Sequence, residues 1–279
     1  MYLTKKSFWK ILIMVLAYFT LGSICTGLAI ICAILGSDTK ILYLGILLYA
    51  LCPLVAWWGV YAEGTGKLLG LSRKLVRTEL KPAEFIKAYE ALKNADDLMI
   101  KKPTLDVLLQ VAVAYDSLDD QANALAVADE MLAVAPQKRK TYAKLAKCSL
   151  LFSYGTVEEA EQLFCEARME KLDFMCQAVV QDILNADRAY AIGDYKTAEI
   201  YCQKKSEQKF PKLDNISTLV FKFKLGRIYE KLGEFQKAIS YYEYCAKHGG
   251  ETAMQAEAAQ AQARLSQSTQ TNKYSPQGV

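Results

Sequence analysis

The chain has 279 residues, of which 52% are hydrophobic and 23% are charged, and its formal net charge is +4 at pH 7. From Glu63 onward, 30 Lys and Arg residues face 29 Asp and Glu residues. This near balance argues against nucleic acid as a partner, since nucleic-acid binding relies on a basic surface. A single histidine, His248, excludes metal sites built from several histidines.

Two uncharged stretches near the start of the chain predict membrane-spanning helices. Residues 11–37 form 27 uncharged positions and residues 41–62 form another 22. A helix needs roughly 20 apolar residues to cross about 30 Å of hydrocarbon. Because so few residues separate the stretches, we expect spans over about 11–35 and 41–62 that form a transmembrane hairpin within residues 1–62. A cleaved signal peptide is the alternative for the first stretch, which is longer than a typical apolar core.

Basic residues near the ends of the spans predict their orientation. Lys5, Lys6 and Lys10 precede the first span, whereas Lys40 is the one basic residue of the connection. Residues 63–81 form a basic linker, in which we expect lipid-headgroup contacts from Arg73, Lys74, Arg77 and Lys81. The bias predicts an integral membrane protein with both termini in the cytoplasm. A bacterial inner membrane is the expected setting, because the architecture is compact.

Small residues recur along one side of the first span. Gly22, Thr26, Ala29 and Ala33 follow helical spacing, and small side chains let helices approach closely in lipid. We expect this stripe to form the seam of the hairpin or a homo-oligomer contact. The alternative is that small residues are simply common in such helices. Residues 64–67, Gly-Thr-Gly-Lys, are expected to form a flexible joint after the second span.

A repeat pattern occupies the rest of the chain. Alanines recur at intervals of 36, 36, 38 and 40 residues, at positions 88, 124, 160, 198 and 238. Turn signals precede several of them, at Gly155, Gly193 and Gly233. The clearest copy carries Leu225-Gly226, Tyr229, Gly233, Ala238 and Tyr242. This copy resembles the tetratricopeptide repeat, a helix–turn–helix unit of about 34 residues.

The resemblance implies an all-α fold in which residues 82–266 form a right-handed α-solenoid. Four units would start near Leu105, Tyr142, Val179 and Leu219, after a half unit over residues 82–100. A capping helix would cover residues 251–266, and residues 267–279 would be a disordered tail. The alternative is a helical solenoid outside the family. Asn215 begins an Asn-Ile-Ser sequence that we expect to cap a helix rather than to be glycosylated.

In the tetratricopeptide family, the first helices of successive units line a groove that binds proteins. Carried over by position, the resemblance assigns to this groove Tyr142, Ser149, Phe152, Ile183, Asp187, Tyr190, Phe223, Arg227, Glu230 and Lys231. Packing between helices is the alternative role for each of these residues. The implied function is a membrane-anchored adaptor that binds an unidentified protein partner. The second possibility is an accessory or assembly subunit of a transport, secretion or respiratory complex, contacted mainly through the hairpin.

The residues that carry chemistry elsewhere are sparse in this sequence. Eight cysteines are scattered without a C-x-x-C pair, which favours a reducing compartment and a packing role. His248 stands beside two glycines at an expected helix end, where its charge would interact favourably with the helix dipole. We therefore expect no enzymatic activity, no catalytic residues, no cofactor and no metal.

Overall fold

The protein is mainly helical in this computed structural model, which describes residues 2–34, 40–95, 98–101, 103–170, 177, 183–208 and 212–273. The prediction of a helical fold is therefore confirmed. One small ladder was not predicted, in which β1 (Tyr2–Thr4) pairs antiparallel with β2 (Leu98–Lys101). The chain divides into a first unit of residues 1–70 and 90–103 and a second unit of residues 71–89 and 104–279.

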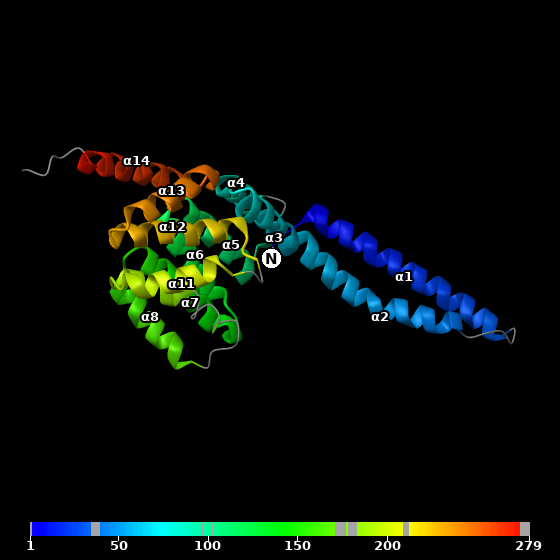
Figure 1. The fold of residues 1–279 in the computed structure, drawn as a ribbon. Coiled ribbons are helices and arrows are strands. Elements are labelled where there is room, and N and C mark those ends of the chain that lie inside the picture. The colour runs from blue at the N-terminus through cyan, green and yellow to red at the C-terminus, as the bar shows by residue number, and fades with distance from the viewer. Residues whose placement is uncertain are drawn as a thin grey trace, which may run out of the picture. The chain divides into compact units, whose positions relative to one another are not determined.

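The first unit is built on two long helices that lie side by side (Figure 1). Helix α1 (Lys5–Ile34) and helix α2 (Lys40–Tyr61) run antiparallel. Near the start of α1, Ser7 Oγ donates a hydrogen bond of 3.0 Å to Glu63 Oε2, just after α2 ends. A Cβ atom on Gly59 would lie 2.9 Å from Met14 Cε and 3.4 Å from Ile11 Cγ1, so side chains of α1 pack closely on this part of α2.

Of the small-residue stripe predicted on α1, half can be described. Gly22 is buried and Thr26 is half-buried, and Thr26 Oγ1 donates to the carbonyl of Gly22 over 2.8 Å. Gly22 and Thr26 are thus at least half-buried, which agrees with a place in the contact between two helices. The side chains of Ala29 and Ala33 lie outside the described residues. Pro53 lies inside α2, which remains helical on both sides of it.

Large apolar side chains cover the outside of both helices. The most exposed are Ile34 at 79% and Trp57 at 75%. Others above half exposure are Trp9, Ile13, Leu16, Phe19, Ile24, Ile30, Ile31, Leu47, Leu54 and Trp58. Within the described residues, Lys5–Leu28 is long and apolar enough to cross a membrane, a property that N-terminal signal sequences share. Ala50–Tyr61 is a shorter apolar helix.

The segment after α2 stays helical, which differs from the flexible joint expected over residues 64–67. It comprises η1 (Ala62–Gly66) and η2 (Arg73–Thr78), two stretches of π-helix, with helix α3 (Lys67–Ser72) between them. An ion pair one turn apart joins Glu63 and Lys67 across η1. Such pairs and continuous backbone hydrogen bonds favour the helix over an irregular joint.

The second unit consists mainly of helices in consecutive pairs (Figure 1). Helix α4 (Pro82–Lys93) precedes them. The pairs are α5 (Leu105–Ser117) with α6 (Gln121–Val134), α7 (Lys140–Ser153) with α8 (Val157–Met169), α10 (Asn185–Ala191) with α11 (Tyr195–Ser206), and α12 (Asn215–Lys231) with α13 (Phe235–His248). A 3-10 turn, η3 (Gln137–Arg139), precedes α7. Successive pairs also pack on each other. The second helix of the first pair, α6, packs on α7, and the second helix of the third pair, α11, packs on α12.

The boundaries agree with most predicted units but not with the predicted tail. Three predicted starts, near Leu105, Tyr142 and Leu219, lie within four residues of the starts of α5, α7 and α12. The fourth, near Val179, lies outside the described residues. Helix α14 (Ala253–Lys273) packs on α13 and continues past the predicted end of the capping helix at residue 266. Residues 267–273 are thus helical.

The turns inside the pairs share one geometry. In each turn a backbone N–H donates to the carbonyl five residues earlier, over 2.8 to 3.0 Å, in the bonds from Asp120 to Tyr115, Thr156 to Leu151, Asp194 to Ala189 and Glu234 to Tyr229. The residue before each donor has a positive φ, at Asp119 (57°), Gly155 (81°), Gly193 (84°) and Gly233 (76°). Glycine adopts this conformation without strain, and aspartate is among the residues that tolerate it.

The recurring alanines lie four residues after these donors, in the first turn of the second helix of each pair. Ala124, Ala160, Ala198 and Ala238 are all 0% exposed. In the last pair, Gly226 supplies the matching small position on the first helix, because a Cβ there would lie 2.9 Å from the buried ring of Tyr242. The spacing seen in the sequence therefore corresponds to close helix contact.

Residues 72–81, which we call the strap, connect the first and last helix pairs. Arg77 Nε donates to Gln110 Oε1 on α5 over 2.9 Å, and Arg77 Nη1 pairs with Asp214 Oδ2 over 2.5 Å. The carbonyl of Leu80 accepts from the N–H of Glu251 over 2.9 Å, between α13 and α14. The strap is therefore held at both ends of the row of helix pairs.

The strap also has an apolar side and a strained backbone position. Leu75, Val76 and Leu80 are buried, and Leu80 packs with the apolar core of the last helix pairs. Leu80 has a φ of 57°, which is costly for a residue with a branched side chain. Burial of its side chain and the bond from Glu251 offset this cost.

The N-cap of α12 is Asp214, and the expected cap at Asn215 is wrong by one residue. Asp214 Oδ1 accepts from the N–H of Ser217 over 2.8 Å. Asn215 is the first helical residue, and its side chain donates to the carbonyl of Thr78 in the strap over 2.7 Å.

Asp214 therefore has two roles that mutation can separate. Asp214→Ala removes the cap and the partner of Arg77, and we expect it to lower the free energy of unfolding by about 1–3 kcal/mol. Asp214→Asn keeps a capping oxygen and should cost less. Thermal unfolding of the full chain in detergent, followed by circular dichroism, measures both. Equal stability of wild type and Asp214→Ala would contradict this role.

The carboxylate of Asp214 also predicts a dependence on pH. Burial opposes its charged form, but hydrogen bonds from Ser217 and Arg77 outweigh burial and hold the pKa of Asp214 below its ordinary value of 3.8. A lowered pKa in the folded state means that its stabilisation is present above about pH 4 and is lost as the pH falls through the folded-state pKa. The stability difference between wild type and Asp214→Asn should shrink over that acidic window.

Candidate partner-binding face

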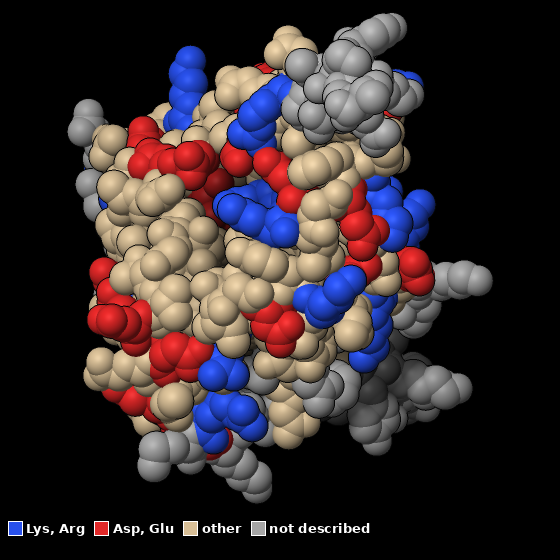
Figure 2. Space-filling model, turned by 60° about the vertical axis from the view of Figure 1, so that its left-hand side comes forward, with Lys and Arg blue, Asp and Glu red and all other residues tan. Residues whose placement is uncertain are grey.

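Most of the predicted groove residues lie on the first helices of successive pairs, and the structure divides the set into three groups and one separate residue, Tyr142. Tyr142, Ser149 and Phe152 are on α7, Asp187 and Tyr190 are on α10, and Phe223 to Lys231 are on α12. Ile183 lies just before α10. Charges of both signs are interspersed on the surface seen in Figure 2, so no single-sign field marks that face.

The first group is apolar and packs inside the helix stack. Phe152 is 2% exposed and packs edge-on against Phe164, with ring centroids 6.4 Å apart. Phe223 is 6% exposed and packs against Tyr242 at 5.9 Å. Ile183 is half-buried against the same core as Phe223. Packing between helices, the alternative role considered for these residues, describes what the structure shows of them.

The second group forms a polar chain across three helices. Ser149 Oγ on α7 donates to Asp187 Oδ2 on α10 over 2.7 Å, and Lys224 on α12 pairs with Asp187 Oδ1. Burial alone would lower the pKa of Lys224, but the facing carboxylate of Asp187 outweighs burial and raises it. Because Asp187 is 4% exposed, this carboxylate is committed to holding the helices together.

The remaining residue of α7, Tyr142, lies between two clusters of the core. It is half-buried and packs against both the first and the second helix pair. The guanidinium of Arg139 lies 5.7 Å from the centre of its ring.

Sequence reasoning did not single out Lys224, although it shares a helix face with Arg227 and Lys231 at intervals of three and four residues.

The third group lines a cavity of about 270 Å³. Tyr190, Arg227, Glu230 and Lys231 come from the prediction, whereas the other lining residues are Tyr242, Glu257, Gln260, Ala261 and Arg264. The last four are on α14, where their spacing of three, one and three residues places them on one helix face. That spacing was visible in the sequence, but helix α14 was expected only to cap the stack.

Ion pairs and stacking order the walls of this cavity. The guanidinium of Arg227 lies 5.2 Å from the centre of the Tyr190 ring. Glu230 is already bonded twice, by Arg264 Nη2 over 2.5 Å and by the hydroxyl of Tyr242 over 2.9 Å. The hydroxyl of Tyr242 remains a donor, because burial and its bond to Glu230 raise the pKa of Tyr242.

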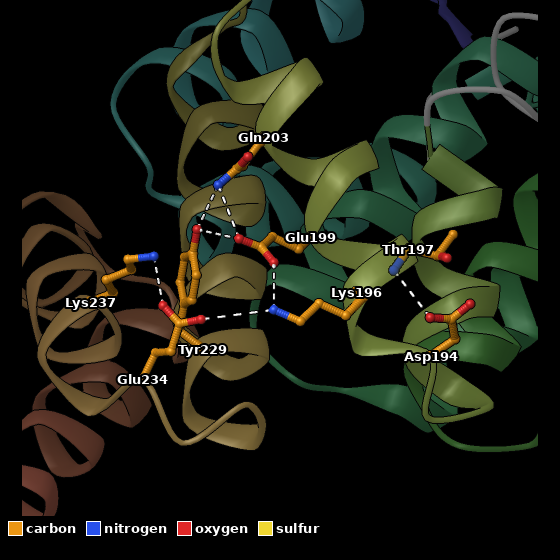
Figure 3. Close-up of polar contacts among 8 residues, drawn as sticks. All are labelled: Asp194, Lys196, Thr197, Glu199, Gln203, Tyr229, Glu234 and Lys237. Carbon is orange, nitrogen blue, oxygen red and sulfur yellow. Dashed lines mark hydrogen bonds and ion pairs between the residues drawn. The ribbon is translucent and has the colours of Figure 1, made fainter.

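A separate polar cluster joins the third and fourth helix pairs (Figure 3). The hydroxyl of Tyr229 on α12 donates to Glu199 Oε1 on α11 over 2.9 Å and accepts from Gln203 Nε2 over 2.6 Å. Tyr229 is 2% exposed, and burial, followed by the bond to Glu199, raises the pKa of Tyr229. The cluster is therefore a structural connection. Lys196 links Glu199 to Glu234, at 3.9 and 4.0 Å, and Glu234 also pairs with Lys237 over 2.6 Å.

The four predicted lipid-contact residues differ in what holds them. Arg77 in the strap pairs with Asp214 over 2.5 Å, and Lys81 pairs with Glu84 over 3.1 Å. Lys74 lies 3.8 Å from Glu79, with 68% of its side chain exposed. Arg73 is exposed. Arg77 is thus a structural residue, and the two exposed side chains remain the stronger candidates for contact with lipid.

The buried thiols are suited to packing. Burial raises the pKa of Cys148 and of Cys245 to about 12 and the pKa of Cys202 to about 11. These thiols therefore stay protonated near neutral pH and do not form the reactive thiolate. Among the described residues, no three His, Cys, Asp or Glu side chains gather closely enough to hold a metal ion.

Comparison of the chain with protein-family models, with curated proteins and with solved structures finds no match.

Tyr229 allows a test of the connection between the third and fourth helix pairs. Tyr229→Phe removes the hydroxyl that bonds Glu199 and Gln203, and we expect a loss of about 1 kcal/mol in the free energy of unfolding. Tyr241→Phe is a matched control, since its ring stacks on Tyr229 at 5.6 Å and its hydroxyl has no hydrogen-bond partner among the described residues. Chemical denaturation of the full chain in detergent compares the two. A larger loss for the control would refute the role assigned to Tyr229.

Proposed function

We propose that this protein is a membrane-anchored adaptor of the tetratricopeptide type. In this proposal α1 and α2 form a transmembrane hairpin in a bacterial inner membrane. The helix pairs of the second unit form a right-handed solenoid in the cytoplasm and bind a protein partner there. Anchoring raises the local concentration of the adaptor around other membrane proteins, so that even weak binding becomes effective.

The observation that carries the proposal is the apolar surface of α1 and α2. Side chains such as Phe19, Ile24 and Trp57 are 53%, 59% and 75% exposed. Water would make this surface costly, at about 25 cal/mol for each Å² of apolar area, whereas lipid matches it. Antiparallel packing of the two helices supports a hairpin. The lysines at the start of α1, Lys5, Lys6 and Lys10, support a cytoplasmic N-terminus.

Recurring geometry supports the tetratricopeptide assignment. Equivalent turns with a positive φ, and a fully buried alanine four residues beyond each bond donor, recur through four helix pairs. Units of this kind bury their apolar faces against their neighbours and leave one continuous surface for recognition. Buried, protonated thiols and structural ion pairs are consistent with recognition as the main role of this unit.

Membrane extraction tests the hairpin. Phe19→Asp combined with Ile24→Asp places two carboxylates in the proposed span, at a cost of about 3 kcal/mol each near the bilayer centre. Wild type should stay in the membrane pellet after alkaline carbonate treatment, and a larger share of the double variant should be released, because only α2 would then be wholly apolar. Gln162→Asp with Gln262→Asp is the matched control in the second unit and should stay in the pellet.

Intact mass and protease access complete that experiment. The mature chain should retain residues 1–34, and a C-terminal tag should be digested only after the membrane is opened. A mature chain that lacks α1 would show a signal sequence and overturn the hairpin. Digestion of the tag from outside sealed cells would overturn the orientation.

Partner capture tests the adaptor role. Proximity labelling from the C-terminus should mark the same proteins in cells that express the wild-type chain and in cells that express the chain with the exposed Trp57 and Trp58 changed to Leu. If labelling depends on these two rings, the accessory-subunit function replaces the adaptor, because the hairpin would then be the main contact.

A further inference from the structure

The cavity between α10, α12 and α14 has a chemistry that specifies its ligand, and we propose that it binds an acidic side chain of the partner protein. This inference rests on the proposed adaptor function and adds the chemical class of the partner segment. The inference depends on Arg227 and Lys231, which line the cavity and lie on one face of α12.

Two cations in the cavity remain available to a ligand. Neither Arg227 nor Lys231 forms an ion pair with another described residue, and both are exposed. They are four residues apart, so they lie on the same side of α12. A carboxylate placed between them would gain two charged hydrogen-bond donors.

Arg227 is positioned for planar recognition. Its guanidinium lies 5.2 Å from the centre of the Tyr190 ring, and Tyr190 is itself packed edge-on against Tyr195 at 5.5 Å. An arginine held on an aromatic ring loses less freedom when its N–H groups bind a ligand. Those N–H groups match the two oxygens of a carboxylate.

The carboxylates in the cavity differ in how far they oppose an acidic ligand. Glu230 is neutralised by Arg264 over 2.5 Å and also accepts from Tyr242. Glu257 also lines the cavity and has no ion pair with another described residue. The cations Arg227, Lys231 and Arg264 therefore outnumber the carboxylates, and Glu257 is the one group expected to weaken acidic binding.

The size of the cavity favours a side chain over a larger ligand. Its volume of about 270 Å³ is below the range of about 300–1,000 Å³ that is usual for cofactor and drug-sized sites. An acidic residue within a protein segment fits this space, and the rest of the segment would lie on the surrounding helices. We assign the carboxylate to a protein because the proposed function is protein binding.

The test measures binding of fluorescein-labelled octaglutamate to the full chain in nanodiscs of uncharged phosphatidylcholine. Fluorescence anisotropy should show binding that weakens as salt is added, since salt screens exposed charges. Arg227→Gln should weaken binding about tenfold, the usual effect of losing a charged hydrogen bond. The affinity of Arg227→Lys should lie between the affinities of wild type and Arg227→Gln, because lysine keeps the charge but lacks the planar guanidinium.

Three comparisons make the result specific to the cavity. Lys247→Gln removes an exposed cation on α13 that does not line the cavity, and it should leave binding unchanged. Glu257→Gln removes the opposing carboxylate and should tighten binding. Labelled octalysine should not bind through this site, so its affinity should not fall in Arg227→Gln.

Several outcomes would overturn the inference. These are no binding of octaglutamate by wild type, equal binding by wild type and Arg227→Gln, and displacement of the peptide by an equal concentration of inorganic phosphate, which would show a general anion site. If the protein does not bind octaglutamate while proximity labelling still marks a partner, the cavity assignment fails and the adaptor function stands. If both fail, the adaptor function fails as well.

Discussion

Close contact between the two helices of each pair is the constraint on which the second unit depends. A fully buried alanine on the second helix leaves room for the first helix, and in the last pair Gly226 lets the ring of Tyr242 pack directly on the backbone. Turns with a positive φ make this approach possible, because they reverse the chain within a few residues. Larger residues at these points would separate the helices and uncover the apolar core.

Polar contacts add specificity to this apolar packing. Asp187 joins three helices through Ser149 and Lys224, and Tyr229 joins α12 to α11. Asp187 and Tyr229 are buried, so leaving either unpaired would cost more than its bond contributes when made. The helix pairs are thereby held in one register, which keeps Tyr190 and Arg227 in place beside the cavity.

The strap changes how a row of helix pairs is expected to behave. In an open array each unit contacts only its neighbours, and stability is nearly a sum over units. Here residues 72–81 bond α5 through Gln110 and the start of α12 through Asp214. The first and last pairs are thus coupled through a segment that precedes both in the chain, which favours cooperative unfolding.

Local patterns in the sequence determined the helices, the apolar character of the first two, and the spacing of the buried alanines and turn glycines. These features depend on hydrophobic period, backbone conformation and side-chain size, all of which are properties of neighbouring residues. Tertiary structure decided the rest. It buried Phe152 and Phe223, paired Arg77 with Asp214, and brought Glu257 and Arg264 of α14 to Arg227. Those outcomes depend on which distant helices meet, because burial and charge pairing are set by contacts between residues far apart in the chain.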